Sequence, residues 1–187
     1  MSKVNNFTVL EEKINSDIEF CENGVKVIYK SDKKLNEEID SIKEKVKCKY
    51  GKAEISNNNI TIKSKDEKIQ IDLYEKSNCT SVEMVIINNK KEKNMEDLMK
   101  ELTELEGNKA KDVQYFSYLK GIINNKEDGL NLIKKTRELK EVNTLNVRNG
   151  YVGTAVLYNK ERVNFAVSTY NTGTYLIIGT PIIFTTY

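Results

Sequence analysis

Two pairs of adjacent carboxylates, Glu37-Glu38 and Glu127-Asp128, are the residues in this chain best suited to acid–base chemistry. Such a pair can transfer protons when its surroundings push the two pKa values apart. The chain has no histidine, the commonest general base near neutral pH, and no glycine-rich phosphate loop or serine nucleophile motif. Both pairs stand at the start of a predicted helix, where carboxylates favour the helix dipole. We therefore predict solvated helix residues and no enzyme. The alternative is a carboxylate site that only the fold assembles.

The three cysteines offer little chemistry. Cys21, Cys48 and Cys79 are odd in number and widely spaced, and no two form a C-x-x-C pair. This pattern favours three free thiols, while one disulfide between any two of them stays open. A zinc site would lack its remaining ligands. We predict no metal and no cofactor.

Tyrosine is the residue type most suited to binding a partner, because it joins an apolar ring to a polar tip. It is concentrated in the second half of the chain. Tyrosine and threonine also suit half-exposed strands, which is the structural explanation of the same pattern. The residues that we predict to form a partner surface are Tyr151, Tyr158, Tyr170, Tyr175, Gly179, Thr180, Pro181 and Tyr187.

The charge distribution argues against nucleic acid as that partner. The 30 basic and 28 acidic residues are evenly spread, and only Arg137, Arg148 and Arg162 are arginines. DNA binding depends on neutralising phosphates, which requires a basic surface. Minor-groove binders also insert apolar wedges between bases. The three phenylalanines that could act so, Phe116, Phe165 and Phe184, are predicted to be core residues instead.

Helical and strand periodicities alternate in the same order in both halves of the chain. Leu35, Ile39, Ile42 and Val46 have the spacing of an amphipathic helix, and four short alternating strands follow Gly51. The stretch "NMEDLMKELTEL" and the residues after it then give helix, strand, helix and four strands once more. The two halves correspond at an offset of about 92 residues.

We therefore predict one α+β domain over residues 1–187, built from pseudo-repeats at about 5–90 and 93–187. Its sheet should be mainly antiparallel and open, with the helices packed on one side. No side chain from Val163 to Tyr187 carries a formal charge. The last strand, "TYLIIGTPIIFTTY", should thus lie in the middle of the sheet and be longer than its counterpart in the first half. Pro181 should mark a bulge or the end of pairing.

The closing "GTPIIFTTY", with the duplicated order of elements ahead of it, resembles the YwmB family of Firmicutes. The match is clearest at Gly179, Thr180, Pro181 and Tyr187. The resemblance implies a fold like the saddle of the TATA-box-binding protein. It also implies an exported protein, associated with the cell envelope or sporulation. The family has no assigned activity and no catalytic residues.

The expected function is a non-catalytic binding module whose partner is a protein or envelope component. DNA binding through the saddle and an unrecognised carboxylate enzyme are the two alternatives. Met1 to Asn15 lacks the apolar run of a signal peptide, so an extracytoplasmic location rests on the resemblance alone. The longest apolar stretch spans about ten residues, whereas a transmembrane helix needs roughly twenty. Monomer and homodimer both stay open, since strands at sheet edges can pair.

Overall fold

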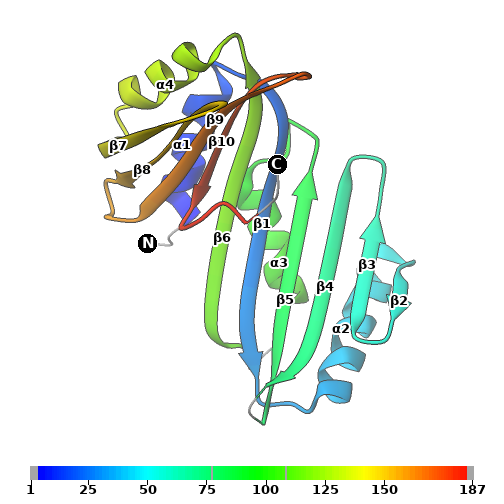
Figure 1. The fold of residues 1–187 in the computed structure, drawn as a ribbon. Helices are drawn as coiled ribbons and strands as arrows, with labels where there is room; N and C mark the ends of the chain where they lie inside the picture. The colour runs from blue at the N-terminus through cyan, green and yellow to red at the C-terminus, as the bar shows by residue number, and fades with distance from the viewer. Residues whose placement is uncertain (1–3, 77, 108, 185–187) are drawn as a thin grey trace. The chain divides into compact units, whose positions relative to one another are not determined.

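The computed structural model describes residues 4–76, 78–107 and 109–184, which form an α+β structure (Figure 1). The first seven elements are α1 (Val4–Asn15), β1 (Glu19–Ser31), α2 (Leu35–Tyr50), β2 (Glu54–Ser56), β3 (Asn59–Lys63), β4 (Glu67–Lys76) and β5 (Cys79–Asn88). The next seven are α3 (Met95–Leu105), β6 (Lys111–Ile123), α4 (Lys126–Lys135), β7 (Leu139–Val147), β8 (Gly150–Leu157), β9 (Arg162–Tyr170) and β10 (Gly173–Thr180).

The strands form a 10-stranded antiparallel sheet in the order β2-β3-β4-β5-β1-β6-β10-β9-β8-β7. The α+β class and the antiparallel sheet predicted from the sequence are therefore confirmed. None of the helices within the described ranges is long and apolar enough to cross a membrane.

The chain divides into two compact units. Unit 1 comprises residues 1–23, 91–96 and 116–187, and unit 2 comprises residues 24–90 and 97–115. The long strands β1 and β6 each contribute residues to both units.

In unit 2, helix α2 is fixed by the apolar stripe that its sequence predicts. Ile39, Ile42 and Val46 are all buried, and α2 contacts β4 and β5. Burial of each such side chain stabilises the fold by roughly 1.5–3 kcal/mol. The helix ends where Gly51 takes a φ of 74° and donates its N–H to the carbonyl of Lys47 at 3.0 Å. Glycine adopts this left-handed conformation without the strain of a Cβ.

The carboxylate of Glu38, in the first turns of α2, is fully buried rather than solvated, so that prediction is wrong. It accepts hydrogen bonds from the hydroxyls of Tyr29 at 3.0 Å and Ser31 at 3.1 Å, and lies 3.5 Å from the Lys33 ammonium. Burial, and next the Glu38 charge, raise the pKa of Tyr29. Hydroxyl groups of β1 therefore stabilise the buried Glu38 carboxylate, which the helix pattern alone would place in water. The other three residues of the two carboxylate pairs are exposed, as predicted.

Unit 2 also links its two helices by polar contacts. Lys49 of α2 pairs with Glu104 of α3 at 2.5 Å, and the Tyr50 hydroxyl donates to Glu101 at 2.6 Å. Beyond α3, the Tyr115 hydroxyl donates to the half-buried Glu106 at 2.6 Å. These contacts hold α2 and α3 beside each other within this unit.

In unit 1, helix α4 begins at Asn125, whose side chain accepts the backbone N–H of Asp128 at 2.9 Å. It ends at Lys135, because Thr136 takes an extended conformation with φ −68° and ψ 113° while its N–H makes the last helical bond, to the Leu132 carbonyl. The chain then enters β7 at Leu139. The Thr136 hydroxyl also donates to the Leu132 carbonyl, at 2.7 Å.

Strand β10 lies between β6 and β9, inside the sheet, as its lack of charge predicts. It spans 8 residues, fewer than the 10 of β5, so the prediction of a longer last strand is wrong. Pairing stops at Thr180, the residue before Pro181, which has no N–H to donate to a ladder. The apolar residues Ile182 to Phe184 therefore leave the sheet instead of extending it.

Candidate binding face

Helix α4 covers one face of the strands in unit 1. Its position identifies which strand residues point towards it and which point away. A Cβ added to Gly129 of α4 would lie 2.2 Å from Ile123 and 2.9 Å from Val167, so these two side chains face the helix. Val167 pairs with Leu176, and Leu176 with Gly121. Because side chains alternate along a strand, the residues between these point away from α4. We call the face of β6–β10 that points away from α4 the outer face.

The outer face carries one formal charge in its middle, Lys120, and two more, Arg162 and Lys140, at its end beside the turn at 158–161. Alternation along the paired strands places these residues on it: Lys120 and Ile122 of β6, Tyr175, Ile177 and Gly179 of β10, Asn164, Ala166 and Ser168 of β9, and Val152 and Thr154 of β8. Only Lys120 among them is ionised. The face is therefore a mixture of apolar, hydroxyl and amide groups.

The first hollow on the outer face is lined by aromatic rings and one ammonium. Lys120, Tyr170, Thr172, Tyr175 and Ile177 enclose about 270 Å³, a volume that we call the tyrosine hollow. The Tyr170 and Tyr175 ring centroids are 6.1 Å apart, and the Lys120 ammonium lies 5.2 Å from the Tyr175 centroid. The Tyr175 hydroxyl donates to the Thr172 hydroxyl at 3.1 Å. Tyr170 is 41% exposed, so its ring is accessible to a ligand.

The lysine of the tyrosine hollow is only loosely held. Its ammonium lies 3.8 Å from the Glu22 carboxylate, at the limit of an ion pair. A cation over a tyrosine ring contributes about 0.5–1 kcal/mol at an exposed site. Lys120 can therefore turn to a ligand carbonyl or hydroxyl at small energetic cost.

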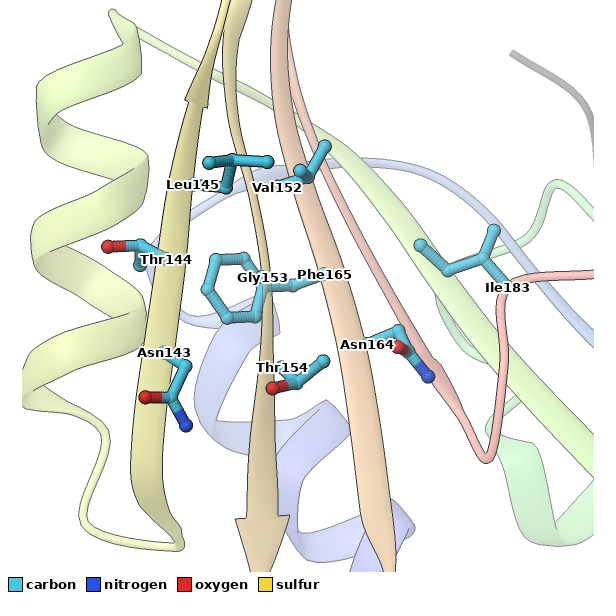
Figure 2. A pocket seen from close by; sticks show the side chains of 9 residues that line it. All are labelled: Asn143, Thr144, Leu145, Val152, Gly153, Thr154, Asn164, Phe165 and Ile183. Carbon is cyan, nitrogen blue, oxygen red and sulfur yellow. The ribbon is translucent and has the colours of Figure 1, made fainter.

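A second hollow of about 460 Å³ lies over β7, β8 and β9 (Figure 2). We call it the edge hollow; its lining residues are Asn143, Thr144, Leu145, Val152, Gly153, Thr154, Asn164, Phe165 and Ile183. Figure 2 shows Leu145 and Val152 at one end, Asn143 and Thr154 at the other, and the ring of Phe165 between them. Gly153 leaves space for that ring, since a Cβ there would lie 2.4 Å from it. Amide and hydroxyl groups thus surround an apolar floor.

The segment after β10 turns back over the outer face. The Asn164 side chain donates to the Pro181 carbonyl, and Ile183 lies against Gly179. The Phe184 ring meets Tyr118 edge-on, with centroids 5.0 Å apart and an angle of 90°. Such pairs contribute about 0.5–1.5 kcal/mol beyond the area they bury. The segment thereby forms one wall of the edge hollow.

The eight residues predicted as a partner surface do not form one surface. Tyr170 and Tyr175 share the tyrosine hollow, and Gly179 lies on the same face. Tyr151 pairs with Val167 and lies on the α4 side, where Lys126 sits 6.0 Å from its ring. Thr180 is buried and donates to the carbonyl of Arg162 at 2.9 Å.

The other three predicted residues lie elsewhere. Tyr158 is exposed in the turn after β8, with Lys140 5.3 Å from its ring centroid. Pro181 follows the end of β10, and Tyr187 lies outside the described residues. Of the predicted core phenylalanines, Phe165 is buried, whereas Phe116 and Phe184 are half-buried and in edge contact at 6.4 Å.

Sequence reasoning missed Lys120, Asn143, Leu145 and Asn164, which contribute to the two hollows. Lys120 follows the apolar Leu119 in a strand whose side chains alternate, so the sequence alone could have placed Lys120 on the face opposite Leu119. Its position beside Tyr175 depends on the register of β6 against β10, and no local pattern records that register.

The cysteines are free thiols, exposed at Cys48 and partly buried at Cys21 and Cys79. Burial raises the pKa of Cys21, although the nearby Lys120 charge works in the opposite direction. A thiol with a raised pKa is a poor nucleophile near neutral pH. Cys21 therefore adds no reactive group beside the outer face.

No family model matches the chain, and no curated protein matches its sequence.

Proposed function

We propose that this protein is a non-catalytic binding module whose outer face contacts a protein partner. The observation that carries the proposal is a sheet face with a single charge in its middle and the tyrosine hollow and the edge hollow on it. Tyrosine rings bordered by amide and hydroxyl groups are typical of protein interfaces, which lose charged residues at their centre. A peptide or loop could place apolar side chains on the tyrosine rings and hydrogen-bond its backbone to the amide and hydroxyl groups.

Nucleic acid suits the same face poorly. Phosphate binding requires several lysines or arginines, since each neutralised phosphate adds to the affinity. Alternation assigns Lys120 to the middle of the outer face, and Arg162 and Lys140 to one end of it, so the described cations of this face do not form a basic patch. Two phenylalanines considered as wedges between bases already pack within the protein: Phe184 packs on Tyr118, and Phe165 fills the space over Gly153.

Catalysis also has little support in the geometry. The residues that line the tyrosine hollow and the edge hollow include no carboxylate. Glu38 and Glu11, the two buried glutamates, hold structural partners instead: Glu11 accepts from the Asn23 amide at 2.7 Å and from the Met95 N–H at 2.9 Å. General acid–base chemistry needs a carboxyl that a substrate can reach.

We further infer that the chain is a duplicated, YwmB-like protein with a saddle fold like that of the TATA-box-binding protein, and that it works outside the cytoplasm. The order helix, strand, helix, four strands occurs twice, which supports duplication. The strand order reads the same from either end, with β1 and β6 at its centre, which supports a symmetric origin. Envelope or sporulation context follows from the resemblance at Gly179, Thr180 and Pro181 alone.

The proposal is tested by placing a photo-crosslinking amino acid at Tyr170 in the native cells. The matched control places it at Tyr74 of unit 2, which is 42% exposed against 41% for Tyr170. We expect discrete, protease-sensitive adducts from position 170. None of them should also form from position 74. A nuclease-sensitive adduct from position 170 would favour DNA binding. Adducts that are the same at both positions would refute a specific outer face.

A further inference from the structure

The two ends of the sheet are protected to different extents against pairing with another strand. Strand β2, at one end, spans 3 residues, and its Glu54 is engaged by Lys63 at 3.0 Å. Strand β7, at the other end, spans 9 residues. Natural proteins protect sheet edges by short strands, charges and bulges. Short length and a paired charge protect β2, so β7 is the edge that needs closer inspection.

Protection of β7 covers only its first part. A bulge interrupts its pairing with β8 between Lys140 and Asn143, and Glu141 within it has a φ of 52°. From Asn143 to Val147 the strand is regularly paired with β8 and has no charged side chain. Leu145, in the middle of this stretch, is 65% exposed, and β7 has no second partner strand within the described residues. These five residues are an unprotected edge.

The unprotected edge is complementary to a second copy of itself. When two β7 edges pair antiparallel about a two-fold axis through Leu145, Leu145 lies opposite Leu145 of the second copy. Asn143 then lies opposite Val147, so the uncharged stretches coincide. Arg148, just beyond one end, comes one residue away from Glu141 at the other copy's bulge. Among the described residues neither Glu141 nor Arg148 has an ion-pair partner of its own.

We propose that this protein forms a two-fold symmetric homodimer through Asn143–Val147 of β7. Isologous pairing satisfies the open backbone groups of both edges and removes two exposed leucines from water. It also brings the Glu141 and Arg148 charges together twice. Five-residue edges bury less area than a standard interface, so the dimer is weak and depends on concentration.

The dimer would enlarge the proposed binding face. Leu145 and Asn143 line the edge hollow, so the edge hollows of the two copies become neighbours across the two-fold axis. A partner with two copies of one binding segment then gains effective concentration at the second site. This inference uses a different surface from the Tyr170 test, and either can fail without the other.

Sedimentation equilibrium of the full chain, from about 10 µM to about 1 mM, tests the dimer. We expect a monomer–dimer equilibrium that Leu145→Lys abolishes, with an unchanged melting temperature because the side chain is exposed. The matched control is Ile55→Lys on β2, where Ile55 is 50% exposed; it should leave the dimer intact. A monomer throughout, or a dimer that Leu145→Lys leaves unchanged, would overturn the proposal.

Charge reversal identifies the register. Glu141→Arg and Arg148→Glu should each weaken dimerisation about 2- to 5-fold per lost pair, the range for exposed ion pairs. The double variant should restore the wild-type equilibrium, because the charges are exchanged rather than removed. Two additive losses in the double variant would contradict the proposed register.

Discussion

The tyrosines of the two units differ mainly in their hydrogen bonds to glutamate. In unit 2, Tyr29, Tyr50 and Tyr115 each donate a hydrogen bond to a glutamate of the same unit. In unit 1, Tyr151, Tyr158 and Tyr175 each have a lysine ammonium within 6.0 Å of the ring centroid, as Tyr50 of unit 2 also has at 5.5 Å. A tyrosine whose hydroxyl donates to a glutamate contributes to the fold, whereas we propose that tyrosine rings of unit 1 are available to a ligand. We therefore propose that unit 1 provides the interaction surface and that unit 2 is mainly structural.

The largest expected effect comes from breaking the buried network of unit 2 at Glu38. Glu38→Gln keeps one acceptor oxygen but places an amide NH2 group against one of the two hydroxyl donors, Tyr29 or Ser31, and removes the charge that faces Lys33. We expect the free energy of unfolding to fall by about 2–4 kcal/mol, because a buried donor loses its acceptor. Denaturant unfolding measures the change. The neighbouring, exposed Glu37→Gln is the control and should change stability by less than about 0.5 kcal/mol.

A smaller effect separates the two kinds of tyrosine directly. Tyr115→Phe removes the hydroxyl that donates to Glu106 and should lower the free energy of unfolding by about 1–2 kcal/mol. Tyr170→Phe removes a hydroxyl on an exposed ring and should change it by less than about 0.5 kcal/mol. Equal losses from the two substitutions would contradict the division of roles between the units.

Alkaline titration extends this contrast to pH. Burial, and next the bond to Glu106, raise the pKa of Tyr115 to about 12, above the ordinary value of 10.0. A raised pKa favours the neutral phenol in the fold, so its stabilising effect is complete below pH 10 and lost as pH rises towards 12. Unfolding experiments across this range should show a fall in stability that is smaller in Tyr115→Phe. An unchanged pH dependence in that variant would contradict the assignment.

The periodicity of the sequence was enough to place the helices and strands, because apolar stripes such as Ile39, Ile42 and Val46 are local signals. It could not place Glu38, whose burial depends on hydroxyls of β1 that no helix pattern contains. It also could not end β10 at Thr180, since "PIIF" is as apolar as the strand before it. The candidate site depends on register: Lys120 and Tyr175 come together only because β6 pairs with β10. Long-range pairing of this kind leaves no trace in local spacing.

A small effect is also expected at Lys120 of the tyrosine hollow. Lys120→Met removes the ammonium near Tyr175 and the long contact to Glu22 but keeps an apolar side chain. We expect the free energy of unfolding to fall by at most about 1 kcal/mol, since both contacts are partly solvated. Denaturant unfolding would again measure it. A loss as large as that of Glu38→Gln would show that Lys120 is a structural residue of unit 1.

The most direct test of the outer face is the affinity of the partner recovered through the Tyr170 adduct. Isothermal calorimetry would compare the wild-type chain with Tyr170→Ser and with the equally exposed Tyr74→Ser. Our account predicts a loss of affinity of about 10-fold or more for Tyr170→Ser, as for an aromatic residue at the centre of an interface. It predicts a change of less than about 2-fold for Tyr74→Ser. Equal losses, or a loss at Tyr74 alone, would contradict a binding face on unit 1.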